Sequence, residues 1–166
     1  MTPMAEHVGA LDLGVKWDPN APEALLLSND FGKTLLALNP HPDDSDQRCV
    51  VLVWSGAHSA CLADPNDEAI SGHRLYGSGL SNLLWAGVVS DSETIRALEK
   101  QNRVHPFHDP SRFDDLTHHV VLLKECVVEV VAMAVAVSRF EGTTADAATA
   151  AMKGKPTPSH RQIRAN

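Results

Sequence analysis

The sequence predicts an α+β fold: one mainly antiparallel sheet of five to seven strands, with one clear helix. Three observations lead to this prediction. The 166 residues, 43% of them hydrophobic, are enough for one domain with a buried core. Short runs rich in Val and Leu lie between turn residues, which is typical of strands. Only one segment clearly joins a helix cap to helical spacing of its apolar side chains.

The ends of the chain differ in composition from its middle. Gly and Pro interrupt the first stretch, so we expect 1–22 to be a flexible N-terminal arm. A single α+β domain should cover 23–140. We expect 141–166 to be a flexible basic C-terminal tail, in which the Ala-rich stretch 143–154 is a candidate for a short helix.

Five strand candidates precede the clear helix, and all are short apolar runs. They are residues 24–27, 34–38, 49–54, 57–63 and 83–89. The first two flank the string SNDFGK, whose Asn, Asp and Gly favour a turn and therefore a hairpin. Ser55 and Gly56 turn the chain after the third candidate, so we expect the fourth to pair back onto it in antiparallel fashion.

The clear helix begins after Ser92. This serine is a good N-cap for SETIRALEKQNRV, and Glu93 places a carboxylate in the first turn, where the helix dipole stabilises it. A second, shorter helical turn is expected where Asp109 caps Pro110.

Residues 117–138 give the strongest strand prediction. Val is too dense there for a comfortable helix, because its χ1 angle is restricted in helices. Lys124 and Glu125 form the polar break, which predicts a hairpin of two long strands. The second strand is apolar on both faces, so it should be central or covered by a partner. This pattern motivates the expectation of a homodimer.

Charge and cysteines exclude several classes of protein. The net charge is −7, and residues 141–166 carry +2, so residues 1–140 carry −9. An acidic body repels phosphate backbones, so we do not expect nucleic-acid binding. The chain has no apolar run of membrane-spanning length and no signal-peptide pattern, so we expect a cytoplasmic protein with no membrane partner. Cys49, Cys61 and Cys126 are expected to be reduced, buried thiols.

The long connection 65–80 is the first candidate for a site, because long aperiodic loops in compact domains are usually functional or disordered. His73 and Tyr76 could form an acid–base pair. Arg74 could hold an anionic substrate group through its planar fork. Asp67 and Glu68 could orient the histidine.

The helix exit NRVHPFHDP is the second candidate for a site. His105 and His108, three residues apart and followed by an Asp, could share a metal or shuttle a proton. Arg103 could again hold an anion. The alternative is structural, since a His at a helix C-terminus stabilises the dipole and a Pro stops the helix. His118 and His119 begin a strand nearby and must face opposite sides of it, so only one could join a shared site.

The string HPDD after the strand candidate 34–38 resembles the metal motif of zinc-dependent de-N-acetylases of the LmbE type. The resemblance implies that His41 and Asp44 are zinc ligands and that Asp43 is a general base. It covers five or six residues and departs from the family at Ser45, where the family has Glu. The alternative is a polar hairpin loop.

The strings NDEA, GH-x-LY-x-x-GL and N-x-VHP-x-H, together with the Val-rich hairpin, resemble a recurring family of small bacterial proteins with no assigned activity. The resemblance covers about residues 64–132 and names no reaction. Two hypotheses therefore stand. The chain is a ligand-binding or accessory protein with a small-molecule ligand, or a small enzyme with a histidine-based acid–base or metal site where 65–80 meets 103–109. No cofactor is implied.

Overall fold

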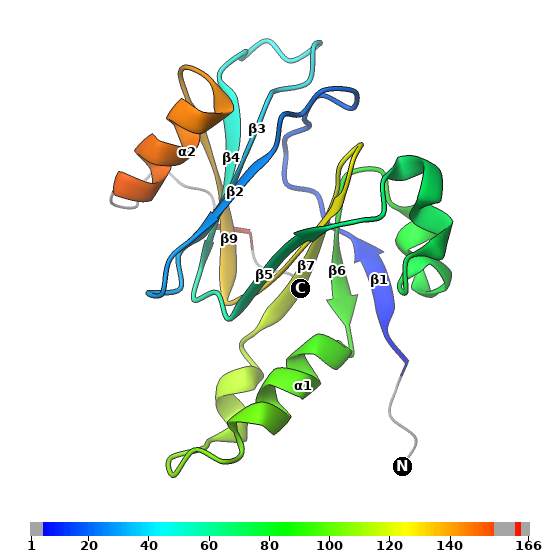
Figure 1. The fold of residues 1–166 in the computed structure, drawn as a ribbon, viewed down its shortest axis with the longest axis vertical. Helices are drawn as coiled ribbons and strands as arrows, with labels where there is room; N and C mark the ends of the chain where they lie inside the picture. Colours follow the sequence, from blue (N-terminus) through cyan, green and yellow to red (C-terminus); the bar gives the residue numbers. More distant parts are fainter. Residues whose placement is uncertain (1–4, 155–161, 164–166) are drawn as a thin grey trace.

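The computed structural model describes residues 5–154 and 162–163. In this part of the chain, ten strands form two five-stranded antiparallel sheets, with two α-helices and four short 3-10 helices around them (Figure 1). The predicted α+β class with antiparallel strands is therefore confirmed. The strands are divided between two packed sheets instead of lying in one. No helix in the described ranges is long and apolar enough to cross a membrane.

Each sheet combines strands from distant parts of the chain. The first sheet has the order β1 (His7–Ala10), β6 (Ala86–Ser90), β7 (Thr117–Leu122), β8 (Val127–Ala132) and β5 (Ser59–Ala63). The second has the order β10 (Gln162–Ile163), β9 (Ala134–Phe140), β4 (Cys49–Ser55), β3 (Thr34–Leu38) and β2 (Leu25–Ser28). The predicted hairpin around SNDFGK is confirmed, since β2 pairs with β3.

Two chain segments turn a corner together and pass from the second sheet to the first. One runs from β4 to β5 and the other from β9 back to β8, and they stay paired through the corner. Met133 N–H donates to Ser55 O (3.0 Å), and His58 N–H donates to Val131 O (2.8 Å). Gly56 turns here with φ +62°, and a Cβ on it would lie 2.6 Å from the Met133 side chain. Glycine is therefore needed at this point.

This corner corrects one expectation about strand pairing and one about strand length. The fourth strand candidate does not pair back onto the third, because β5 pairs with β8 and β4 pairs with β9. Residues 117–138 do form the predicted hairpin around Lys124 and Glu125, since β7 pairs with β8, but its second half is not one long strand. They hold β7, β8 and most of β9, and the chain changes sheet at Met133. Local turn residues fixed where the strands end, but not which distant strand completes each pair.

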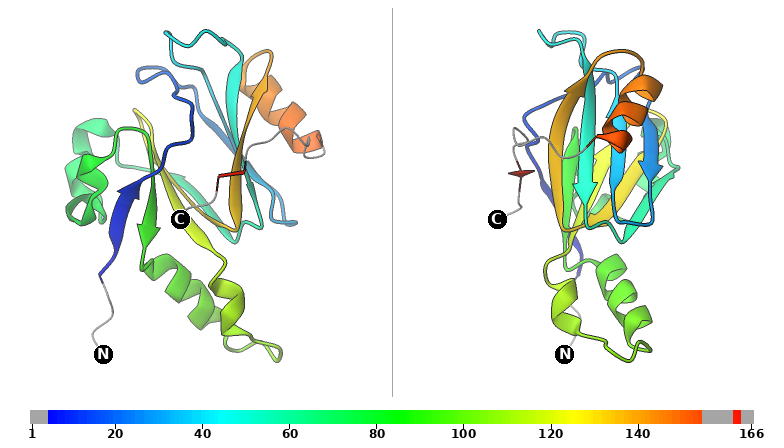
Figure 2. Two further views of the ribbon diagram at one scale, coloured as in Figure 1. Left: turned by 180° about the vertical axis from the view of Figure 1, so that it is seen from behind. Right: turned by 90° about the vertical axis from the view of Figure 1, so that its left-hand side faces the viewer.

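The packing has four layers, visible side by side in Figures 1 and 2. The main core lies between the two sheets and includes Trp17, Trp54 and the inward side chains of β8. Helix α2 (Thr144–Lys153) covers the outer face of the second sheet. The 3-10 helices η1 (Asp67–Gly72), η2 (Tyr76–Ser78) and η3 (Leu80–Asn82) cover part of the outer face of the first sheet. The strand that is apolar on both faces is thus covered within the chain.

Neither end of the chain is an arm over its described length, which corrects both tail predictions. Strand β1 pairs with β6 along four residues, and Trp17 is buried between the sheets and bridges Pro40. Helix α2 buries Ala147, Ala148 and Ala151 against the second sheet. Burial of apolar side chains by partners distant in sequence stabilises these segments despite their Gly, Pro and Ala content. The rest of the predicted tail, 155–161 and 164–166, lies outside the described residues.

The caps predicted at Ser92 and Asp109 are confirmed, and the Ala-rich candidate at 143–154 is a helix. Ser92 caps α1 (Glu93–Asn102) by accepting a hydrogen bond from Ile95 N–H. Asp109 caps η4 (Pro110–Phe113). Thr143 caps α2 through a reciprocal capping box with Asp146. These boundaries depend on local hydrogen bonds only, which explains why the sequence alone predicts them.

Candidate functional site

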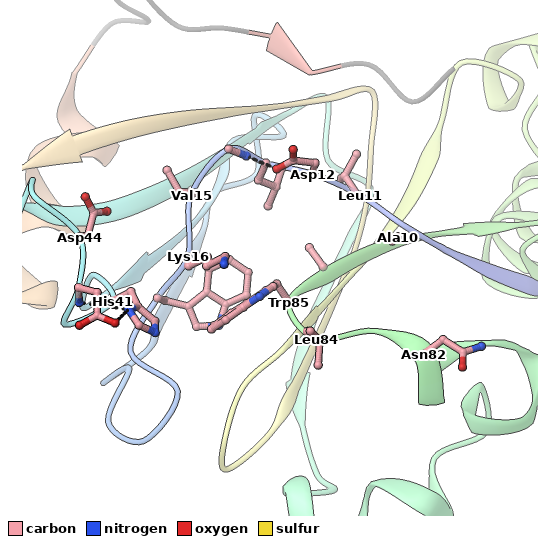
Figure 3. Close-up of a pocket in the computed structure, with 15 residues that line it drawn as sticks. Ala10, Leu11, Asp12, Val15, Lys16, His41, Asp44, Asn82, Leu84 and Trp85 are labelled. Atoms are coloured by element: carbon pink, nitrogen blue, oxygen red, sulfur yellow. Dashed lines mark hydrogen bonds and ion pairs between the residues drawn. The ribbon is translucent and has the colours of Figure 1, made fainter.

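A pocket with a volume of about 670 Å³ opens between the two sheets (Figure 3). Three segments form its walls. One is the crossing from β1 toward the second sheet, residues 10–17; the second is the loop after β3 at 41–44; the third is the approach to β6 at 82–86. Small-molecule sites commonly have volumes of roughly 300–1,000 Å³. The pocket is therefore large enough for a small organic ligand.

Two tryptophans form the aromatic wall of this pocket. Trp17 is buried and donates from Nε1 to Leu122 O (3.1 Å), which fixes its ring. Trp85 packs edge-to-face against it, with ring centroids 5.4 Å apart. Because Trp17 is fixed, the half-buried ring of Trp85 is held in one orientation toward the pocket. Leu84, with 81% of its surface exposed, extends this apolar wall (Figure 3).

Two nitrogen-bearing side chains lie against Trp85. Lys16 Nζ is 5.8 Å from the centre of the Trp85 ring, in cation–π range. The His41 ring packs edge-on to Trp85 with centroids 6.0 Å apart. Asp43 N–H donates to His41 Nδ1 (3.1 Å), so Nδ1 carries no proton and the imidazole proton lies on Nε2. His41 is thus a donor through Nε2.

The acidic residues at the pocket are of three kinds. Asp44 Oδ2 accepts from Arg139 Nη2 at 2.5 Å, and this hydrogen bond lowers the pKa of the Asp44 carboxyl. Asp12 Oδ1 accepts from Gly14 N–H (2.8 Å). Asp43 reaches into solvent, with its side chain 92% exposed.

The HPDD string therefore does not fit the zinc site that its resemblance implies. The Asp44 carboxylate already accepts a hydrogen bond from Arg139, and Nδ1 of His41 already accepts one from the Asp43 backbone N–H. Among the residues that the structure describes, no group of three or more His, Cys, Asp and Glu side chains is placed to hold a metal ion. The loop instead contributes one wall of the pocket.

A second, smaller hollow of about 220 Å³ lies on the outer face of the first sheet and holds part of the predicted site. Its centre is Glu129 on β8. This carboxylate lies 2.5 Å from Arg74 Nη2, 2.8 Å from His118 Nε2 and 3.3 Å from His73 Nε2. Burial would raise the pKa of Glu129, but the hydrogen bond from His118 and the charges of Arg74 and the histidines outweigh it and lower the pKa.

The Glu129 cluster continues to the cap of α1 and to the N-terminal segment. Ser92 Oγ lies 2.8 Å from His118 Nδ1 while also accepting from Ile95 N–H. Glu6 binds Arg74 Nη1 through one oxygen (2.8 Å) and Glu93 N–H through the other (2.8 Å). One network thus connects β7, β8, the 65–80 connection, α1 and the segment before β1.

The order Ser92–His118–Glu129 has the chemistry of a hydrolase relay, but its geometry favours a structural role. Only 5% of Ser92 is exposed, and this residue does not line the hollow. Its oxygen is already used as a helix cap. A nucleophile must reach the substrate. We therefore interpret the relay as the way α1 is fixed to the sheet.

The structure does not bring the two predicted halves of the histidine site together. His73 and Arg74 lie at Glu129, beside the first sheet. His108 lies at the far end of α1, where it contacts Glu99 and Asn102 (both 2.9 Å), and Arg103 binds the same Glu99. Figures 1 and 2 show these two segments at different ends of the first sheet.

The remaining predicted site residues also lie apart from one another. Asp67 pairs with Lys124 (3.2 Å), and Glu68 is exposed. Tyr76 is half-buried in η2. The exposed His105 packs its ring against Phe107, with centroids 6.0 Å apart. Two cysteine predictions need correction as well, since Cys61 is exposed and Cys126 only half-buried, although all three cysteines are free.

Sequence reasoning missed the centre of both sites. Glu129 was detectable as the single charged residue in the run CVVEVVAMAVAV, where a carboxylate needs a partner. Lys16 and Trp85 gave no such indication, because only the packing of distant segments brings them together.

Comparisons of the chain with protein-family models, with curated proteins and with solved structures found no match.

Proposed function

We propose that the protein binds a small molecule in the pocket between the two sheets, as a cytoplasmic ligand-binding or accessory protein. The observation that carries the proposal is the half-buried ring of Trp85, fixed by Trp17 and flanked by Lys16 and His41 at a pocket of about 670 Å³. An apolar wall with a few convergent polar groups is the usual form of a small-molecule site. The resemblance to a family without assigned activity is compatible with this proposal.

The test compares ligand binding by the wild type and by two aromatic variants. A library of small metabolites is screened by thermal shift, and hits are measured by calorimetry. Trp85→Ala should abolish binding of the hits, whereas Phe31→Ala, which removes an exposed ring on another loop, should leave it unchanged. Trp85→Leu serves if Trp85→Ala does not fold. Hits that bind both Trp85 variants as well as the wild type would contradict the proposal.

The alternative function, an enzyme with histidines from 65–80 and 103–109, has less support. His73 and His108 each bind a different glutamate, Glu129 and Glu99, and the two segments lie apart. The donors in these clusters already have acceptors within the chain. A substrate would have to displace those contacts before it could use the histidines.

The structure removes the original reason for proposing a homodimer, and exposed apolar side chains now support that proposal. Its motivation was a strand that is apolar on both faces, and this strand is covered by the other sheet, the 3-10 segment and α2. Large apolar side chains still lie on the surface, among them Val104 and Phe107 beside the end of α1. Light scattering after size-exclusion chromatography tests it, and a strict monomer removes it.

A further inference from the structure

The pocket between the sheets has one flat apolar surface suited to a ring. Trp85 packs edge-to-face against Trp17 and is half-buried, so part of its ring stays accessible at the pocket. Aromatic rings pack against each other in offset or edge-to-face geometry and gain free energy beyond the area that they bury. Leu84 beside it adds an exposed apolar side chain. A planar ring is the ligand shape that uses both.

Two hydrogen-bond donors border that surface and lack an acceptor in the described residues. Lys16 Nζ forms no ion pair there, in contrast to Arg74, Arg103 and Arg139, each of which binds a carboxylate. His41 uses Nδ1 as the acceptor for Asp43 N–H, which leaves Nε2–H as a donor. Donors that meet an ionised acceptor form the stronger class of hydrogen bond.

The neighbouring carboxylates do not take up these donors. Asp44 binds Arg139, and Asp12 binds the backbone of its own turn. Asp43 lies 3.9 Å from His41 Nδ1, the nitrogen without a proton, and its side chain is in solvent. Lys16 and His41 therefore remain the groups that face a ligand on Trp85.

We propose that the pocket selects planar aromatic molecules that carry a carboxylate, with the ring against Trp85 and the carboxylate at Lys16 Nζ and His41 Nε2. The two oxygens of one carboxylate give each donor an acceptor. This specificity rests on the proposed ligand-binding function and names its ligand class.

The experiment uses three naphthalene probes of similar size that differ in charge. Calorimetry measures 2-naphthoate, 2-naphthamide and 2-naphthylmethylammonium, each to millimolar concentration, on the wild type, Lys16→Met and Lys100→Met. Lys100 lies exposed on α1 and serves as the matched control. We expect naphthoate to bind about tenfold more tightly than the amide, since hydrogen bonds to a charged acceptor are roughly twice as strong as those to a neutral one. Lys16→Met should remove that preference, and Lys100→Met should keep it.

The outcomes separate the two proposals. Equal binding of all three probes, with no effect of Lys16→Met, overturns the carboxylate preference and leaves the pocket as a binding site. Tighter binding of the ammonium probe also overturns it, because the acidic side chains would then dominate. If none of the probes binds and the metabolite library gives no hit that depends on Trp85, the proposed function itself fails. If Lys16→Met does not fold, the comparison of the three probes on the wild type still tests the preference for a carboxylate.

Discussion

The pocket at Trp85 and the hollow at Glu129 use their polar side chains in opposite ways. Around Glu129, the charged and polar side chains pair with one another within the chain: Arg74 binds Glu6 and Glu129, and His118 lies between Ser92 and Glu129. Around Trp85, the donors of Lys16 and His41 face an open volume. Polar groups satisfied by the chain contribute to stability, whereas unsatisfied groups beside an apolar wall are available to a ligand. The comparison predicts that substitutions at Glu129 change stability and substitutions at Trp85 and Lys16 change binding.

The largest expected effect is the loss of stability in Glu129→Ala. Removing the carboxylate leaves the fully buried His118 without the acid beside its Nε2, while Arg74 keeps its contact with Glu6. Breaking a buried pair by deleting one partner costs about 3–5 kcal/mol, and we expect about 4 kcal/mol in the free energy of unfolding. Urea unfolding measures it, with Glu68→Ala, an exposed glutamate, as the control. A loss below about 1 kcal/mol, within the range of surface ion pairs, would break the comparison.

The next effect concerns the opposite face of β7, where His119 packs edge-on against Trp54 between the sheets. Burial lowers the pKa of His119 to about 4 from an unfolded value of 6.5. The folded state therefore disfavours the proton. The contribution of His119 to the free energy of unfolding is fully present above pH 6.5. It is lost as the pH falls from 6.5 to 4, by up to about 3 kcal/mol. Unfolding curves at pH 7 and pH 4.5 measure this loss, and His119→Leu should reduce it. An unchanged loss in the variant would assign it to other groups.

Ser92→Ala should cost less, about 1–2 kcal/mol in the free energy of unfolding. It removes the N-cap of α1 and one partner of His118. Thermal and urea unfolding measure the change. Ser90→Ala, an exposed serine at the end of β6, is the matched control. Reaction of Ser92 with a fluorophosphonate probe would instead indicate a nucleophile and contradict the structural role.

The smallest effect on stability is expected for Lys16→Met. Lys16 is exposed and forms no ion pair in the described residues, so the free energy of unfolding should change by less than about 0.5 kcal/mol. Circular dichroism during thermal unfolding checks this. A loss of 2 kcal/mol or more would show that Lys16 contributes to the fold, and the contrast between the two hollows would weaken.

The elements could be predicted from the sequence where local chemistry defines them. Ser92, Asp109 and Thr143 each cap a helix through hydrogen bonds within three residues, and β2 and β3 meet across a turn of Asn, Asp and Gly. The pairing of distant strands could not be predicted, since a Val-rich strand matches many partners equally well. The division into two sheets followed from that pairing.

Prediction of the sites failed for the same reason. His73 and His108 were recognised by residue type, but they lie next to Glu129 and Glu99, to which sequence reasoning did not connect them. Trp85 comes near Lys16 only because β1 joins the sheet of β6, a pairing across about eighty residues that the expected N-terminal arm excluded. The polar network was visible only as one glutamate in an apolar run.

The paired corner at Gly56 and Met133 also has a consequence for biosynthesis. During synthesis, β4 cannot pair with β9, nor β5 with β8, until these partners are made more than sixty residues later. At translation rates of about 5–20 residues per second, their edges stay open for several seconds on the ribosome. Such non-local pairing also slows folding into the millisecond-to-second range. A chain that stops before residue 127 lacks the strands that join both sheets, and we expect it to aggregate.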